Sequence, residues 1–143
     1  VSLESVAMRK TDTYLNDVSI CRATPREYDE LLAFLDVSFG KPKQRWFEIN
    51  YGHIFQAERP YVDCNFLVRK KKKLIGVIGI YPSKLRIGKA TLDMGGVGSV
   101  STLPAARGKG VMSLMLRTVN TALVDDGYQL SWLGGDRYRY RNY

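Results

Sequence analysis

The residues best suited to chemistry form the run Arg107-Gly108-Lys109-Gly110, which lies directly before an amphipathic segment of helical period. A helix N-terminus presents several backbone N–H groups without partners and carries a partial positive charge. Because glycines lack side chains, an anion can approach these N–H groups closely, and the two cations add formal charge. The spacing therefore predicts a site for a phosphate or pyrophosphate at this helix start. A tight turn with two solvated cations is the alternative.

Two familiar phosphate-binding motifs are excluded by the neighbouring residues. A Walker loop continues Gly-Lys with Ser or Thr, whereas Lys109 is followed by Gly110. A dinucleotide fingerprint that begins at Gly96 would require a third glycine where the chain has Ser101. A phosphate bound at this helix start would therefore be held by neither of these two motifs.

A glycine-rich stretch, residues 91–103, leads into this site and has the composition of a long strand. Gly95, Gly96 and Gly98 weaken a strand unless another group must approach its backbone closely. An extended ligand lying along the strand would require such access. A bulge or close packing of a helix would require it equally, so both interpretations remain open here.

Other candidate sites give weaker signals. Residues 69–73 are five consecutive cations, which favour a solvated turn between two apolar strands over a nucleic-acid or membrane patch. Residues 137–143 interleave arginine and tyrosine, a pattern that suits single-stranded nucleic acid or a helix with inward tyrosines. We do not expect nucleic acid as a partner. With His53 as the one histidine, no metal site is expected.

Composition limits the class of protein. The chain has 143 residues, a net charge of +8 and 45% hydrophobic residues, which is typical of one globular domain with an affinity for polyanions. Cys21 and Cys64 are too few for a disulfide framework, so a reduced, cytoplasmic setting is expected. No apolar run has the roughly 18–20 residues of a membrane span, and no membrane partner is expected.

The elements that must position the site follow from the hydrophobic pattern, which predicts the order β-α-α-β-β-β-α-β. A helix begins at Thr24, where Glu27 completes a capping box, and ends at Gly40. A two-residue hairpin is predicted at Gly88-Lys89. The other segments are strands at 18–23, 62–68, 74–81, 91–103 and 128–134, and helices at 43–55 and 111–123. Residues 1–17 are expected to be an N-terminal extension or expression remnant, and 18–143 one domain.

The run Val-Ser-Thr-Leu-Pro-Ala-Ala-Arg-Gly-Lys-Gly-Val-Met at residues 100–112 resembles the acetyl-CoA motif of the GNAT N-acetyltransferase superfamily. That motif reads Arg/Gln-x-x-Gly-x-Gly/Ala, and here Arg107 and Gly110 match while Met112 replaces the last small residue. The element order matches from residue 18 onward. Residues 94–104 resemble the enhanced-intracellular-survival-like branch, in which a GNAT core is joined to further domains.

The resemblance implies an α/β, mixed-sheet GNAT-like acyl-CoA N-acyltransferase fold that ends before its last strands. It implies an enzyme that moves an acetyl group from acetyl-CoA, its cosubstrate, to a primary amine by direct attack. The alternatives are a non-catalytic acyl-CoA-binding module of the same fold and, less favoured, a basic nucleic-acid-binding domain.

The resemblance also assigns roles to individual residues. The backbone amides that would hold the pyrophosphate belong to Arg107, Gly108, Lys109, Gly110, Val111 and Met112, and those that would pair with the pantetheine arm belong to Val100, Ser101 and Thr102. Tyr140 would begin the branch's Tyr-x-x-x-Gly element and act as the general acid. Asp93, Glu48 and His53 are candidates for the general base, with no geometric support from the sequence.

Overall fold

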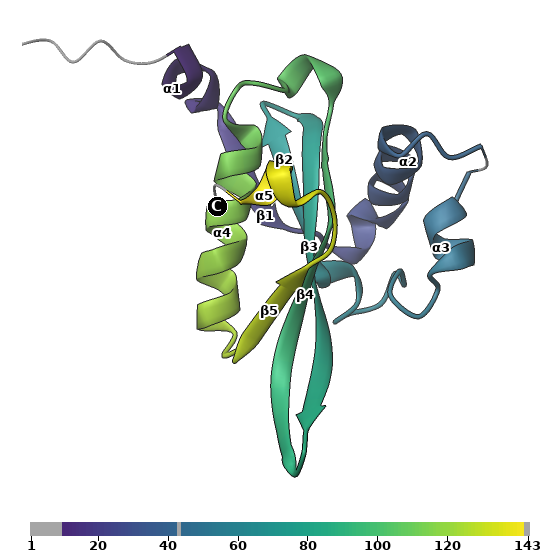
Figure 1. Ribbon diagram of the computed structural model, residues 1–143. Helices are drawn as coiled ribbons and strands as arrows, with labels where there is room; N and C mark the ends of the chain where they lie inside the picture. Colours follow the sequence, from purple (N-terminus) through teal and green to yellow (C-terminus); the bar gives the residue numbers. More distant parts are fainter. Residues whose placement is uncertain (1–9, 43, 142–143) are drawn as a thin grey trace, which may run out of the picture.

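Five strands form one mixed sheet in the order β1-β2-β3-β4-β5 in the computed structural model, which describes residues 10–42 and 44–141 (Figure 1). The strands are β1 (Val18–Arg22), β2 (Asn65–Lys70), β3 (Lys73–Ile87), β4 (Ala90–Thr102) and β5 (Leu130–Leu133). The first four are antiparallel neighbours, and β5 runs parallel to β4. The predicted mixed α/β architecture is confirmed, and the five strands follow one another along the chain as predicted.

Helices cover both faces of the sheet. On one side lie α2 (Tyr28–Ser38) and α3 (Trp46–Asn50), and on the other lies α4 (Val111–Asp125) (Figure 1). The remaining helices are short: α1 (Lys10–Leu15), α5 (Arg137–Tyr140) and 3-10 turns at Pro25–Glu27, Val62–Cys64 and Pro104–Ala106. Within the described residues, no helix combines the length and the apolar character needed to cross a membrane.

The core therefore has two layers separated by the sheet. Leu67 and Val77 face α2, where they pack with Leu31 and Leu35. On the opposite face, residues of β2 and β3 pack with Met115 and Val119 of α4 and with neighbouring residues: Phe66, Val68, Ile75, Ile78 and Ile80. Burial on both faces explains why β3 reads as a continuous apolar run rather than as an alternation.

The first helical segment begins as predicted. The Glu27 carboxylate accepts hydrogen bonds from the backbone N–H of Thr24, at 2.9 Å, and from its hydroxyl, at 3.0 Å. The chain turns through the 3-10 segment into α2 and leaves the helix at Gly40, whose φ is +61°. The two ends of this segment are thus determined by local residues.

The segments predicted at 43–55 and 62–68 are wrong in extent. The helix predicted at 43–55 is limited to α3, because Tyr51 leaves helical geometry at φ −131° and its carbonyl accepts the N–H groups of Ile54 and Phe55 in a turn. The apolar side chains of this stretch form an edge-to-face aromatic cluster, with Phe47 and Phe55 ring centroids 5.4 Å apart. The strand predicted at 62–68 begins only at Asn65, and Leu67 is as buried as its neighbours because both faces of β2 are covered.

The β3–β4 hairpin is the longest feature of the sheet and extends beyond the other strands (Figure 1). Its turn is the predicted one: Ile87 pairs with Ala90 across Gly88-Lys89, and Gly88 has φ +58°. The strand predicted at 74–81 continues through Pro82 to Ile87. Pro82 lies past the end of β2, where β3 pairs only with β4, so the missing N–H is tolerated.

Candidate functional site

The strands β4 and β5 diverge at the C-terminal half of β4. β5 pairs with β4 only from Met94 to Val97, whereas β4 continues to Thr102 with β3 as its one partner among the described residues. Residues 98–102 of β4 therefore have an edge that faces away from β3 and that no described strand occupies. An extended ligand can pair with such an edge like an additional strand.

A bulge bends β4 at the same place. Gly98 pairs with Gly79 and Ser101 with Val77, so two β4 residues, Ser99 and Val100, lie opposite a single residue of β3. Ser99 has φ +56°, a left-handed conformation that is uncommon for a residue with a side chain. A bulge of this kind redirects the following residues, and here those residues are 100–102.

The N-terminus of α4 provides the second part of the site. Gly110 is the N-cap with φ +82°, and Gly108 has φ +69°, so both positions require a left-handed backbone that glycine adopts without a steric penalty. The helix is 15 residues long, and its first backbone N–H groups face the exposed Arg107-Gly108-Lys109 turn. The combination of N–H groups at a helix N-terminus and nearby cations suits an anion.

One cavity of about 680 Å³ joins the free edge of β4 to the start of α4. It brings together most of the residues that the sequence singles out: Val100, Ser101, Thr102, Arg107, Gly108, Gly110, Val111, Met112 and Tyr140. Lys109 does not line it, because its ammonium group lies over the Tyr14 ring, 5.8 Å from the ring centroid.

Five further lining residues were missed at the sequence level: Ser38, Phe39, Ala106, Ser113 and Arg139. Ser38 and Phe39 come from the end of α2, about sixty residues before the cavity-lining part of β4 at 100–102, and no local pattern connects the two segments. Arg139 lies on α5 beside Tyr140, which is half-buried against the α4 side of the core. The Asp136 carboxylate caps α5 by accepting the N–H of Tyr138 at 2.9 Å.

Side-chain packing accounts for the three glycines of β4. A Cβ atom at Gly95 would lie 2.4 Å from Cδ2 of Leu123, and one at Gly96 would lie 3.0 Å from Nε1 of Trp132. A Cβ atom at Gly98 would lie 3.0 Å from the ring of Tyr81. Of the two interpretations from the sequence, close packing is therefore the one that the geometry supports.

None of the three candidate bases lines the cavity. Asp93 lies on the β3–β4 hairpin, where its carboxylate accepts a hydrogen bond from Lys84 at 2.5 Å. His53 is exposed in the loop after α3. Glu48 belongs to a different cavity on the α2–α3 side of the sheet.

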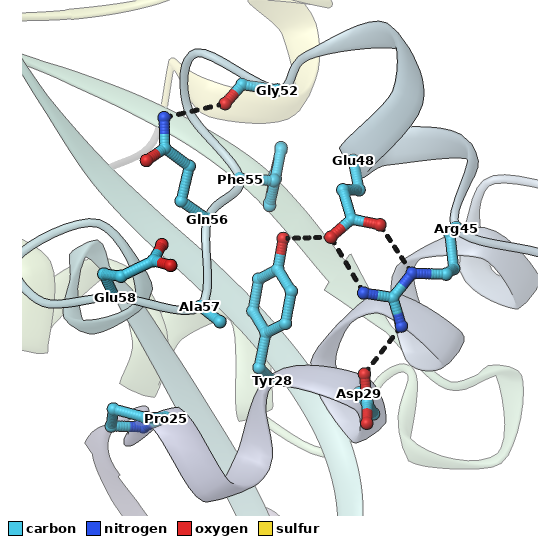
Figure 2. Close-up of a pocket in the computed structure, with 10 residues that line it drawn as sticks. All are labelled: Pro25, Tyr28, Asp29, Arg45, Glu48, Gly52, Phe55, Gln56, Ala57 and Glu58. Carbon is cyan, nitrogen blue, oxygen red and sulfur yellow. Dashed lines mark hydrogen bonds and ion pairs between the residues drawn. The ribbon is translucent and has the colours of Figure 1, made fainter.

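That second cavity, of about 410 Å³, lies between the start of α2, α3 and the following loop (Figure 2). Its polar groups bond to one another: the Glu48 carboxylate accepts from the Tyr28 hydroxyl at 3.2 Å and from Arg45 at 2.8 Å, and Arg45 also donates to Asp29. The hydrogen bond from Arg45 lowers the pKa of Glu48, and burial raises the pKa of Tyr28. Because these groups already have partners, this cavity is the weaker candidate.

The two cationic stretches are partly structural. Arg69 pairs with Glu27 at 3.1 Å and with Glu30 at 2.6 Å, which attaches β2 to the start of α2. Residues 71 and 72 form the turn between β2 and β3. Four residues of the Arg/Tyr stretch form α5, and Asn142 and Tyr143 lie outside the described residues.

Comparison with known proteins assigns the family. Residues 19–143 match the family model described as acetyltransferase (GNAT) domain. A GCN5-related N-acetyltransferase from Kribbella flavida is 22% identical, with a TM-score of 0.71 over 88% of this chain and 32% of that one. A predicted acetyltransferase with acetyl-CoA from Clostridium acetobutylicum is 11% identical, with a TM-score of 0.68 over 87% of this chain and 84% of that one.

Eis1 from Mycobacterium abscessus is also similar, at 14% identity and a TM-score of 0.69 over 87% of this chain and 30% of that one. The chain spans about a third of the length of several such relatives. No curated protein matches the sequence. The family match over residues 19–143, together with the shared fold, shows that this chain belongs to the GNAT acetyltransferase family.

Proposed function

We propose that this chain binds acetyl-CoA and transfers its acetyl group to a primary amine. The observation that carries the proposal is the single cavity that joins the free edge of β4, the N-terminus of α4 and Tyr140. Membership of the GNAT family supports an acetyltransferase of this kind.

The start of α4 would hold the pyrophosphate of the cosubstrate. The backbone N–H groups of Gly108, Gly110, Val111 and Met112 offer donors at the positive end of a long helix. Arg107 lines the same cavity and adds a full positive charge. An anion bound here replaces the water that would otherwise solvate these donors.

The free edge of β4 would receive the pantetheine arm. Val100, Ser101 and Thr102 line the cavity, and Ser101 and Thr102 pair with β3 on their other side, so their outward backbone groups can bond to an extended chain. A backbone N–H near Thr102 would donate to the carbonyl oxygen of the acetyl group as negative charge develops on it.

The chemistry requires one C–N bond to form and one C–S bond to break. The neutral amine attacks the acetyl carbon, the sulfur of the cosubstrate leaves, and Tyr140 donates its phenolic proton to that sulfur. The surplus proton on the nitrogen passes to water, and water returns a proton to the Tyr140 phenolate, which closes the cycle. None of Asp93, Glu48 and His53 lines the cavity.

A second function has one observation in its favour. The lack of a base among these three residues suits a module that binds acyl-CoA without turning it over. The two functions share the cosubstrate site and differ only in whether an amine is acetylated.

Thermal unfolding with and without acetyl-CoA tests the proposal, with ADP and a salt-matched polyanion as controls. A ligand at about 100 times its Kd adds about 2.7 kcal/mol to the free energy of unfolding. We expect a rise in Tm with acetyl-CoA that the polyanion does not reproduce, followed by amine-dependent release of CoA. A rise without CoA release would support the binding module, and no rise would overturn the cosubstrate site.

A further inference from the structure

A partly buried hydrogen-bond network connects three strands beside the bulge of β4. The Tyr81 hydroxyl donates to Oδ1 of Asn65 at 2.8 Å and lies 2.6 Å from Oγ of Ser99. Asn65 is only 1% exposed, and its amide nitrogen donates to the carbonyl of Val62 at 3.3 Å. The phenol of β3 is thus held by β2 on one side and bonded to β4 on the other.

The ring of Tyr81 occupies space that two glycines leave open. A Cβ atom at Gly79 would lie 2.5 Å from the Tyr81 hydroxyl oxygen, and one at Gly98 would lie 3.0 Å from a ring carbon. On the α2–α3 side, the Phe55 ring packs against Tyr81 with centroids 6.0 Å apart. The backbone of the two glycines and the Phe55 ring therefore also restrict where the Tyr81 hydroxyl can lie.

The far end of the network meets β4 at its bulge. Ser99 holds a left-handed conformation, and its side chain is the group that meets Tyr81. Its carbonyl accepts the Ser101 hydroxyl at 3.1 Å. The next three residues, 100–102, line the large cavity, whereas Tyr81 does not. The direction in which these residues present their N–H and C=O groups therefore depends on Ser99.

We propose that Tyr81 is a positioning residue: its hydroxyl, held by Asn65, fixes the left-handed bulge at Ser99 and thereby orients residues 100–102 toward the ligand. Its effect on acetyl-CoA rests on the proposed function, whereas its effect on the bulge does not. The residue acts through the backbone of β4 and donates no proton to the reaction. Burial raises the pKa of Tyr81, which keeps the phenol neutral and able to donate to Asn65.

The sharpest test compares two substitutions at Ser99 that both remove the hydroxyl. Ser99→Ala keeps a Cβ atom that disfavours the left-handed conformation, whereas Ser99→Gly adopts it freely. We expect Ser99→Ala and Tyr81→Phe to weaken acetyl-CoA binding about tenfold, close to the net contribution of one hydrogen bond. Ser99→Gly, and Ser99→Gly combined with Tyr81→Phe, should bind as the parent chain does. If the Ser99 hydroxyl acted in any way other than by fixing the left-handed backbone, Ser99→Ala and Ser99→Gly would have equal affinities for acetyl-CoA.

Two measurements keep this test decisive. Tyr28→Phe removes a phenol hydroxyl on the same side of the sheet without touching β4, and it should leave acetyl-CoA affinity unchanged. Amide hydrogen exchange of residues 99–102 should accelerate in Tyr81→Phe and recover in the double variant, whether or not acetyl-CoA binds. Failure of the parent chain to bind acetyl-CoA would overturn the proposed function alone. Unchanged exchange at residues 99–102 in Tyr81→Phe would overturn the positioning role.

Discussion

Gly110→Asp is the most direct perturbation of the cosubstrate site. Gly110 is the N-cap of α4 at φ +82°, and Asp is one of the few residues other than glycine that adopt that backbone region. The left-handed conformation costs Asp about 1 kcal/mol. We therefore expect Tm to change by no more than about 4 °C.

The effect on binding should be far larger, because the new carboxylate stands where a phosphate would bind. Two like charges about 4 Å apart repel by about 4 kcal/mol at the effective dielectric of a protein surface. That repulsion corresponds to a loss of about a thousandfold in affinity for acetyl-CoA. Isothermal titration calorimetry measures the Kd directly, and unfolding curves on the same samples report the fold.

Two matched variants isolate the charge. Gly110→Asn has nearly the same shape and backbone preference without the charge, and it should lose far less affinity. Gly127→Asp places the same residue at φ +78° just past the other end of α4, where an added Cβ meets no atom within 4 Å, and it should bind normally. An affinity in Gly110→Asp equal to that of the parent chain would refute the assignment of the pyrophosphate to this helix end.

Three further outcomes are expected. Tyr140→Phe should lower kcat for amine acetylation by about 100-fold or more, with acetyl-CoA Kd unchanged, because it removes only the proton donated to the leaving sulfur. Gly95→Ala should cost about 1–2 kcal/mol in denaturant unfolding, because its Cβ would lie 2.4 Å from Leu123 in a filled core. Arg69→Met should lower the free energy of unfolding by about 1–2 kcal/mol at neutral pH. The substitution removes a guanidinium that is 17% exposed, together with its hydrogen bonds to the half-exposed Glu30 and to Glu27.

The stabilisation that Arg69 provides should decrease as the pH falls. The hydrogen bond from Arg69 lowers the pKa of Glu30, and at Glu27 the hydrogen bonds from Thr24 and Arg69 outweigh the opposing effect of burial. Carboxyls with lowered pKa values stabilise the fold above the ordinary value of 4.5, and this stabilisation disappears as the pH falls through their folded pKa values. The parent chain and Arg69→Met should therefore converge in stability in acid, and a constant difference would contradict the ion pair.

Controls for the other two predictions come from neighbouring residues. Tyr138 lies on the same short helix as Tyr140 but is 68% exposed, so Tyr138→Phe should retain full activity. Equal kcat values for the two Phe variants would remove the general-acid role. For Gly95→Ala, a double-mutant cycle with Leu123→Val should show coupling, and strictly additive free energies would contradict the contact.

Residues close together in the chain were well predicted. The capping of the first helix by Thr24 and Glu27, the Gly88-Lys89 turn and the helix after Gly110 all depend on backbone preferences within a few positions. The phosphate-binding candidates at residues 107–112 are contiguous, so the sequence alone places them at one helix end. The family resemblance through residues 100–112 agrees with the family match.

Only the tertiary structure decided the remaining features. The helix that begins at Trp46 ends at Asn50, and Phe55 beyond it packs in an aromatic cluster with Phe47. Ser38 reaches the same cavity as the β4 edge from a distant helix. The bulge at Ser99 and its support by Tyr81 depend on the register of three strands, which no local pattern encodes. Sequence alone determines which backbone conformations each short segment prefers. Which of its side chains then meet is settled by close packing in the core, where space is shared among residues far apart in the chain.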